Sequence, residues 1–245
     1  MHRFFIPNHM IYETSVEFPD KVAHQIQHVL RLQAGDVVMV LDNKGRQFQV
    51  ALADCDFKPL SGSIIKMENV QGEPGTKLDL YISLTQREKF EWILQKCTEV
   101  GVSAFFPFTS SRSLVPASKN QEAKADRWEK IIQEAAEQSR RGHIPDLHGV
   151  QTYTGLFNRL PADYDTCLLA WEGAERMDRL TISPRNGRVG KVALVIGPEG
   201  GFSEDEVNLA GAHGIRVVSL GERILRMETA AVVAAAIILH SLGDL

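Results

Sequence analysis

The sequence predicts an α/β protein in which a small, mostly β module precedes a larger domain of alternating strands and helices. Up to about residue 70, short runs of strand-forming residues dominate, whereas beyond it apolar runs of strand length alternate with amphipathic helical segments. Residues 71–75 (Gln-Gly-Glu-Pro-Gly) have the glycine and proline content of a linker. The alternation after the linker favours a mainly parallel sheet with helices on both faces.

In the front module, a β-hairpin is predicted from Val37–Leu41 and Phe48–Leu52, which are joined by a polar loop containing Gly45. Ser63–Val70 is a further predicted strand. A helix is expected to begin at Pro19 and to bury the apolar residues Val22, Ile26, Val29 and Leu30. These elements fit a small β-barrel-like module with one helix.

The second region contains five predicted strands and four predicted helices. The strands are Leu78–Leu84, Val102–Phe108, Thr166–Trp171, Val192–Ile196 and Ile215–Leu220. The helices are Arg87–Val100, which Gly101 ends, Gln121–Ser139, a helix that begins after Ser203, and Glu228–Leu242.

Composition limits the classes of function that the chain can have. A formal net charge of −4 is unusual for a nucleic-acid-binding protein, so any contact with RNA has to come from local basic clusters. No apolar run reaches the roughly 18 residues of a membrane span. The apolar stretch among the first residues is too short for the hydrophobic region of a signal peptide. We therefore expect a cytoplasmic protein with no membrane partner. Cys55, Cys97 and Cys167 lie far apart without a CxxC pair, which indicates buried free thiols and no metal.

The first segment with chemical potential is residues 192–206, in which a buried strand leads through Gly-Pro-Glu-Gly-Gly-Phe into a helix. Ser203 and Glu206 have the spacing of a capping box. Glycines at this place let backbone N–H and C=O groups approach a ligand closely, and ligands usually bind at the carboxyl ends of strands in open α/β sheets. A tight turn alone would also explain these glycines. The spacing matches neither the dinucleotide-binding nor the phosphate-binding glycine motif.

The second segment, residues 220–231, has the same plan of strand end, glycine, short loop and helix start. Arg226 and Glu228 stand where an apolar helix begins, so their polarity needs a reason. A carboxylate in the first turn of a helix is favourable by itself, and Arg226 can equally be a surface charge. Two such loops facing one cleft predict a small-molecule site, and hence an enzyme.

These two segments together resemble the signature of the knotted SPOUT-class methyltransferases, and specifically the RsmE family, which methylates N3 of a uridine in 16S ribosomal RNA. Residues 28–31, 87–101 and 134–140 match the same family. The resemblance implies a PUA-like RNA-binding domain over residues 1–72. It implies a SPOUT methyltransferase domain over residues 73–245, closed by a deep trefoil knot that binds S-adenosylmethionine. General topology rules argue against a knot, so the residues alone do not predict it.

The family resemblance also implies which residues form the site. The residues expected to bind the cofactor are Ala170, Trp171 and Glu172, then Ile196, Gly197, Pro198, Glu199, Gly200 and Gly201, and finally Leu220, Gly221, Ile224, Leu225 and Thr229. Arg226 and Glu228 are the candidate catalytic residues. Uracil N3 carries a proton that must leave, so Arg226 is expected to stabilise negative charge on a uracil oxygen. Glu228 either orients Arg226 or acts as the base.

The expected partner is 16S ribosomal RNA in the small ribosomal subunit, whose target base must leave its stack to reach the methyl donor. The candidate RNA contacts are Arg3, Arg31, Arg46, Arg87, Lys89, Arg112, Gln138, Arg140 and Arg141. The family forms homodimers through the C-terminal domain, and the apolar segment 229–239 is compatible with that. Two other functions remain open: a knotted methyltransferase acting on tRNA or another ribosomal base, and a non-catalytic RNA-binding module.

Overall fold

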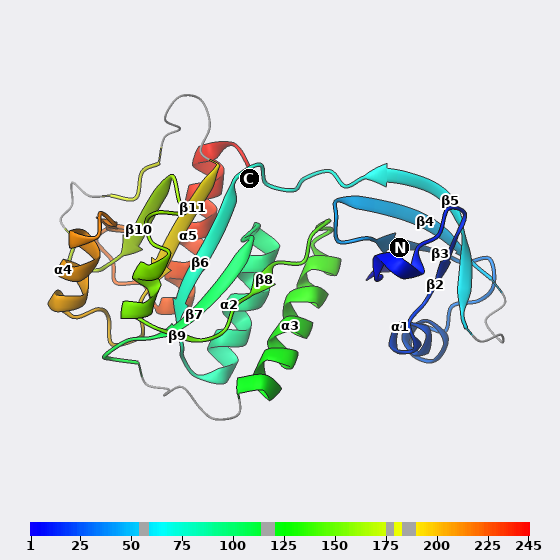
Figure 1. Ribbon diagram of the computed structural model, residues 1–245, viewed down its shortest axis with the longest axis horizontal. Helices are drawn as coiled ribbons and strands as arrows, with labels where there is room; N and C mark the ends of the chain where they lie inside the picture. Colours follow the sequence, from blue (N-terminus) through cyan, green and yellow to red (C-terminus); the bar gives the residue numbers. More distant parts are fainter. Residues whose placement is uncertain (54–58, 114–120, 175–178, 183–189) are drawn as a thin grey trace. The chain divides into compact units, whose positions relative to one another are not determined.

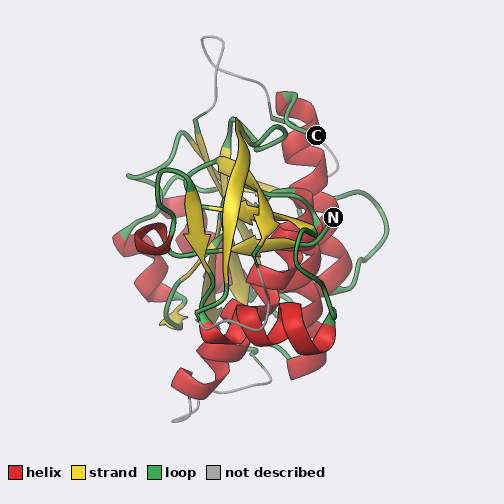
Figure 2. Ribbon diagram, turned by 90° about the vertical axis from the view of Figure 1, so that its right-hand side faces the viewer, coloured by secondary structure: helices red, strands yellow, loops and turns green. Residues whose placement is uncertain are grey.

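The computed structural model describes residues 1–53, 59–113, 121–174, 179–182 and 190–245. The chain forms two compact units, each with its own sheet (Figure 1). Unit 1 contains Met1–Glu73 and Ala136–Ile144, and unit 2 contains Pro74–Ala135 and Pro145–Leu245. The segment from Ala136 to Ile144, which sequence analysis assigned to the second domain, therefore belongs to unit 1. Each unit combines strands with at least one helix. Figure 2 shows the helices and strands of the chain in separate colours.

Unit 1 is built on a five-stranded sheet of order β1-β3-β4-β5-β2, antiparallel except for the parallel pair β1 and β3. Its strands are β1 (Arg3–Phe5), β2 (Ser15–Glu17), β3 (Val37–Leu41), β4 (Arg46–Leu52) and β5 (Ser61–Asn69). The hairpin of β3 and β4 confirms the prediction, and Gly45 in its loop has a φ of 86°. The two strands β1 and β2 were not predicted, because three residues are too few to show a periodicity.

The predicted helical stretch of unit 1 is present, but only its first part is an α-helix. Helix α1 (Asp20–His24) passes into a π-helical turn, η2 (Gln25–Val29), and a 3₁₀ turn, η1 (Asn8–Met10), precedes β2. Ile26 is buried, as predicted, whereas the side chain of Val29 is 65% exposed. The prediction for Val29 was wrong because the wider π turn breaks the 3.6-residue spacing on which the apolar stripe was based.

An ion pair joins the two chain segments of unit 1. Glu73 Oε2 lies 3.1 Å from Arg141 Nη2, and Glu73 Oε1 accepts hydrogen bonds from the backbone N–H groups of Gly142 (2.6 Å) and His143 (3.3 Å). The side chain of Arg141 is only 7% exposed. The RNA contact predicted for Arg141 is therefore replaced by a structural role, since a buried guanidinium that is paired with a carboxylate does not reach a phosphate.

Glu73 makes the stability of unit 1 depend on pH. Burial acts to raise the pKa of the Glu73 carboxyl, but the hydrogen bond and charge of Arg141 and the N–H groups of Gly142 and His143 lower it below its usual range. The stabilisation is therefore present above the unfolded-state pKa of about 4.3 and is lost as the pH falls through the lower, folded-state pKa. We expect Glu73→Gln to destabilise the protein at pH 7 and to have a much smaller effect at the lowest pH at which the protein remains folded. Urea denaturation at both pH values measures this, and an equal effect at the two would contradict it.

Unit 2 contains a seven-stranded sheet of order β12-β10-β11-β6-β7-β8, with β9 also pairing with β7, and all its pairs are parallel. Its strands are β6 (Lys77–Ser83), β7 (Ala104–Thr109), β8 (Asp146–Leu147), β9 (Gln151–Thr152), β10 (Thr166–Ala170), β11 (Lys191–Ile196) and β12 (Arg216–Val218). The predicted parallel sheet is thus confirmed. The strands β8 and β9, of two residues each, gave no signal in the sequence.

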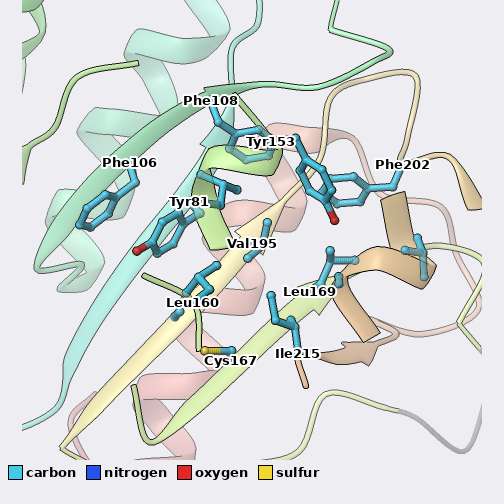
Figure 3. Packing of buried hydrophobic residues seen from close by; sticks show 14 of the residues in the cluster. Tyr81, Phe106, Phe108, Tyr153, Leu160, Cys167, Leu169, Val195, Phe202 and Ile215 are labelled. Carbon is cyan, nitrogen blue, oxygen red and sulfur yellow. The ribbon is translucent and has the colours of Figure 1, made fainter. Parts of the chain in front are cut away.

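Helices cover both faces of this sheet, as predicted. They are α2 (Arg87–Val100), α3 (Gln121–Gln138, which ends in unit 1), α4 (Glu204–Ala212) and α5 (Met227–Leu242), with the 3₁₀ turn η3 (Thr154–Asn158). On one face, a cross-strand row that includes Leu169, Val195 and Tyr81 packs against Phe202 and the residues of α4 (Figure 3). On the other face, α5 contacts α2, β11 and β6.

Two further expectations concern buried thiols and membranes. Cys97 and Cys167 are free and buried, as predicted, and Cys55 lies outside the described residues. In the part of the chain that the structure describes, no helix is long and apolar enough to cross a membrane.

Candidate functional site

A cavity of about 380 Å³ lies beside the glycine-rich loop that follows β11. Its walls come from the ends of β10 and β11, from the loop that leads into α5, and from one side chain of α2. Because the strands of this sheet are parallel, their carboxyl ends meet at one edge, where ligands bind in open α/β sheets. The volume is within the usual range for small-molecule sites, roughly 300–1,000 Å³.

Most of the residues predicted to bind the cofactor line this cavity, as do both catalytic candidates and one of the predicted RNA contacts. They are Ala170 and Glu172, then Ile196, Gly197, Pro198, Glu199 and Gly201, then Ile224 and Leu225, the catalytic candidates Arg226 and Glu228, and Lys89. Sequence reasoning missed Phe202, Met227 and Ala230, which also line it. Apolar residues in a loop or in the first turn of a helix look the same whether they face a cavity or the core, so no sequence pattern identifies them.

Five residues predicted to bind the cofactor are not in the cavity wall. Leu220 and Gly221 line a separate depression that also contains Arg223. Trp171 packs against the hydrophobic core under the sheet, and Thr229 is an exposed residue of α5. Gly200 is exposed, and its carbonyl accepts a hydrogen bond from Arg112.

Glycine is required at two positions of the loop after β11. Gly201 has a φ of 68°, and a Cβ there would overlap the carboxylate of Glu172. A Cβ on Gly197 would lie 2.8 Å from the ring of Phe202, which is buried in the core. At Gly197 the loop backbone therefore lies too close to a packed ring for a side chain, and at Gly201 the positive φ favours glycine.

Glu206 fixes the end of this loop. The predicted capping box is confirmed, since Ser203 Oγ accepts from the N–H of Glu206 (3.2 Å) and Glu206 Oε2 accepts from the N–H of Ser203 (2.9 Å). Glu206 Oε1 also accepts from the N–H of Ser111 (2.9 Å), and Arg112 Nη1 donates to the carbonyl of Gly200 (3.1 Å). The loop after β7 thus supports the glycine loop, and Arg112, predicted to contact RNA, donates to the protein backbone here.

Replacing Glu206 is expected to destabilise the protein more than replacing its capping partner. Ser203→Ala removes one helix cap, which costs about 1 kcal/mol. Glu206→Ala also leaves the N–H of Ser111 without its acceptor, at a further cost of about 1–3 kcal/mol. Urea denaturation of both variants measures the two free energies of unfolding, and equal losses would show that the bond to Ser111 contributes nothing.

Only one of the two carboxylate oxygens of Glu199 has bonding partners. Its Oε1 accepts from Thr85 Oγ1 and lies 3.3 Å from Lys89 Nζ, whereas its buried Oε2 has no hydrogen-bond partner. Burial acts to raise the pKa of Glu199, but the hydrogen bond of Thr85, the backbone N–H of Glu199 itself, and the hydrogen bond and charge of Lys89 lower it below its usual range. Glu199 is therefore ionised at neutral pH. Glu228 Oε2 is also buried without a partner.

Arg226 and Glu228 both line the cavity but are not bonded to each other. Arg226 is the exposed N-cap residue of α5, and Glu228 is in the first turn. No hydrogen bond or ion pair joins these two side chains, and the described residues include no other partner for either. The arrangement does not favour the hypothesis that Glu228 orients Arg226, and leaves the carboxylate available to act on a ligand.

The remaining candidates for RNA contact lie outside the cavity. Arg3 Nη2 donates to Gln47 Oε1 (3.0 Å), Arg46 Nε lies 2.5 Å from Asp42 Oδ2, and Arg87 Nε lies 3.0 Å from Glu91 Oε1. Arg31, Gln138 and Arg140 are exposed. Of these six, only Arg87 belongs to unit 2.

Comparison with known proteins places this site in a family. The model of the RNA methyltransferase domain family matches residues 72–239, a stretch that contains every residue lining the cavity. The ribosomal RNA small subunit methyltransferase E of Synechocystis sp. is 33% identical over 235 residues, which are 96% of this chain and 76% of that protein. The protein of the same name from Bacillus subtilis is 34% identical over 84% of this chain and 82% of its own length.

A solved structure is similar over nearly the whole chain. The crystal structure of ribosomal RNA small subunit methyltransferase E from Neisseria gonorrhoeae bound to S-adenosylmethionine has a TM-score of 0.85 at 26% identity, with 96% of this chain and 95% of that chain covered. Because the family match contains the whole cavity and relatives above 30% identity cover most of both chains, this chain belongs to the ribosomal RNA small subunit methyltransferase E family of RNA methyltransferases.

Proposed function

We propose that the protein is an S-adenosylmethionine-dependent methyltransferase that methylates N3 of a uridine in 16S ribosomal RNA of the small subunit, giving 3-methyluridine. The observation that carries this proposal is the cavity at the carboxyl ends of β10 and β11, where Arg226 and Glu228 meet the glycine loop. The membership of the chain in the family described above supplies the substrate class.

The residues of the cavity fit the cofactor. A cationic ligand suits a wall that contains the ionised Glu199, whose Oε2 has no partner. Gly197 and Gly201 place loop backbone without side chains in the cavity wall, and Ala170, Ile224 and Leu225 offer apolar surface. When it is bound, S-adenosylmethionine supplies an electrophilic methyl group on a positively charged sulfur.

The chain itself has to handle a proton and a negative charge. Uracil N3 becomes a good nucleophile only when its proton leaves, and the resulting charge spreads onto the two ring carbonyl oxygens. Arg226 stabilises that charge as a cation in the cavity wall, and Glu228, which has no other partner for Oε2, accepts the proton. Both residues stand at the start of α5, where the helix dipole favours negative charge.

We also propose a role for each of the two units. Unit 1, with its mostly antiparallel sheet, acts as the PUA-like RNA-binding domain, and Arg3, Arg31, Arg46, Gln138 and Arg140 are its candidate RNA contacts. Unit 2 is the SPOUT domain. The strand order β12-β10-β11-β6 and the return of α5 over β11 and β6 support a chain that passes through its own loop as a trefoil knot.

The enzyme is proposed to act in the cytoplasm as a homodimer formed through α5. This helix is apolar along most of its length, and Val233 and Ile237 remain partly exposed although the helix is packed on the sheet. A helix that is apolar nearly all round needs to be buried on more than one side, which a second copy would provide.

An in vitro assay tests the proposed activity. Purified protein, S-adenosylmethionine with a labelled methyl group, and small ribosomal subunits from cells that lack the modification are incubated, and the RNA nucleosides are analysed by mass spectrometry. We expect labelled 3-methyluridine in 16S ribosomal RNA. Label in another ribosomal base, or in tRNA added as a competitor, would instead indicate a related methyltransferase. A protein that binds RNA but not the cofactor would be a non-catalytic module.

A further inference from the structure

The cavity carries more negative than positive charge. Its wall contains the carboxylates of Glu172, Glu199 and Glu228 and the cations of Lys89 and Arg226, which leaves a formal charge of −1. S-adenosylmethionine has a net charge of +1 at neutral pH, from the sulfonium, the ammonium and the carboxylate groups. Its demethylated product, S-adenosylhomocysteine, has lost the sulfonium charge and is neutral overall.

We propose that Glu199 makes the site discriminate between the two forms of the cofactor, so that methyl transfer itself weakens binding and promotes product release. This inference rests on the proposed function. In the transfer, the S–CH₃ bond breaks with its electron pair remaining on sulfur, the N3–CH₃ bond forms, and the N3 proton goes to the base. The cofactor thereby loses one positive charge, and the attraction of a nearby carboxylate for that charge is lost with it.

Glu199 suits this role because its charge is poorly screened. Its side chain is 19% exposed, and Oε2 is shielded from solvent and accepts no hydrogen bond. Coulomb interactions are much stronger from such a position than from a hydrated one. Lys89 compensates the charge only in part. Its side chain is 37% exposed, and its Nζ, 3.3 Å from Oε1, is bonded to that oxygen and not to Oε2.

The other carboxylates are less suited to it. Glu172 is exposed, so water screens its charge. Glu228 is the proposed base and receives a proton in the reaction, so its charge is not constant. Glu199 is ionised and bonded to Thr85 and Lys89, which fixes both its charge and its place. It is a specificity residue that acts through charge and need not touch the reacting atoms.

Calorimetric titration of the full-length protein with S-adenosylmethionine, S-adenosylhomocysteine and sinefungin, an analogue with an amine in place of the methylated sulfur, tests this. Glu199→Gln keeps an acceptor for Thr85 but removes the charge. We expect it to weaken binding of S-adenosylmethionine and sinefungin about tenfold and that of S-adenosylhomocysteine by less than about threefold. Lys89→Met should increase the preference for S-adenosylmethionine over S-adenosylhomocysteine, because it removes the cation that partly compensates the charge of Glu199.

Each other outcome has a distinct meaning. Equal loss of affinity for all three ligands in Glu199→Gln would overturn the inference and give Glu199 a structural role. A ratio that stays at the wild-type value in both variants would overturn it as well. If Glu199→Gln does not fold, as judged by circular dichroism, the direction of the shift in Lys89→Met decides. If the wild-type protein showed no measurable affinity for either S-adenosylmethionine or S-adenosylhomocysteine, the proposed function would be refuted, and this inference with it.

Discussion

Arg226→Ala is expected to slow methylation about 100- to 1,000-fold while changing the affinity for S-adenosylmethionine by less than about threefold. The reason is that Arg226 is proposed to stabilise charge that develops on the uracil only during the reaction, and removal of one donor to a developing oxyanion costs roughly that factor in kcat. Arg226 lies in the cavity wall and has no bonding partner among the described residues. Its removal therefore leaves none of their polar groups unpaired. Single-turnover methylation of small subunits and calorimetric titration of the cofactor measure the two quantities separately.

Arg223 provides a matched control for this variant. It is an exposed arginine of the same loop, but it lines the separate depression with Leu220 and Gly221. Arg223→Ala should therefore retain a rate within a few-fold of wild type. An Arg226→Ala protein of near wild-type rate would remove Arg226 from the mechanism, and a protein that had lost cofactor affinity with its rate intact would make Arg226 a binding residue.

Gly197→Ala is expected to weaken binding of the cofactor at least about tenfold, which corresponds to roughly 1.4 kcal/mol. The added methyl group would lie 2.8 Å from the ring of Phe202, which packs among Phe108 and Tyr153 in the core. Because a packed core does not yield easily, the glycine loop has to move instead, and with it the backbone that faces the cavity. Calorimetric titration with S-adenosylmethionine checks this directly.

Gly211→Ala is the matched control. Gly211 lies in α4, has no positive φ, and a Cβ there would meet no atom within 4 Å. We expect unchanged cofactor affinity and a gain in stability of about 0.5–1 kcal/mol from the better helix former. If Gly197→Ala bound the cofactor as tightly as Gly211→Ala does, the loop would be an ordinary turn and not part of the binding site.

Local patterns were enough to predict several elements. Helix α2 has the predicted bounds, because the segment has an amphipathic stripe and is followed directly by Gly101, its C-cap. The capping box at the start of α4 was predicted for the same reason, since Ser203 and Glu206 are three residues apart. These signals come from residues that are close in sequence, and the structure confirms both predictions.

Contacts between distant residues could not be predicted in this way. Glu73 and Arg141, which form an ion pair, are 68 positions apart. Glu199 is 114 positions from Thr85 and 110 from Lys89, to which it is bonded. Nothing in the local pattern distinguishes Arg141, which is buried, from Arg140, which is exposed. The assignment of the segment from Ala136 to Ile144 to unit 1 depends on such contacts as well.

The site was predicted in two steps of different kinds. Glycine placement after β11 and polar residues at the start of α5 predicted two loops that face a small molecule, and the structure places Gly197, Arg226 and Glu228 in one cavity wall. The identity of the ligand came from the family resemblance and not from the residues. Residues such as Phe202, Met227 and Ala230 escaped both steps, because the side that an apolar residue faces depends on the tertiary fold.

The most direct test of the central claim is nucleoside mass spectrometry of 16S ribosomal RNA from cells in which the gene for this protein has been deleted. We predict that 3-methyluridine is absent, and that it returns when wild-type protein is expressed but not when Arg226→Ala is expressed. An unchanged level of 3-methyluridine in the deleted cells would contradict the account.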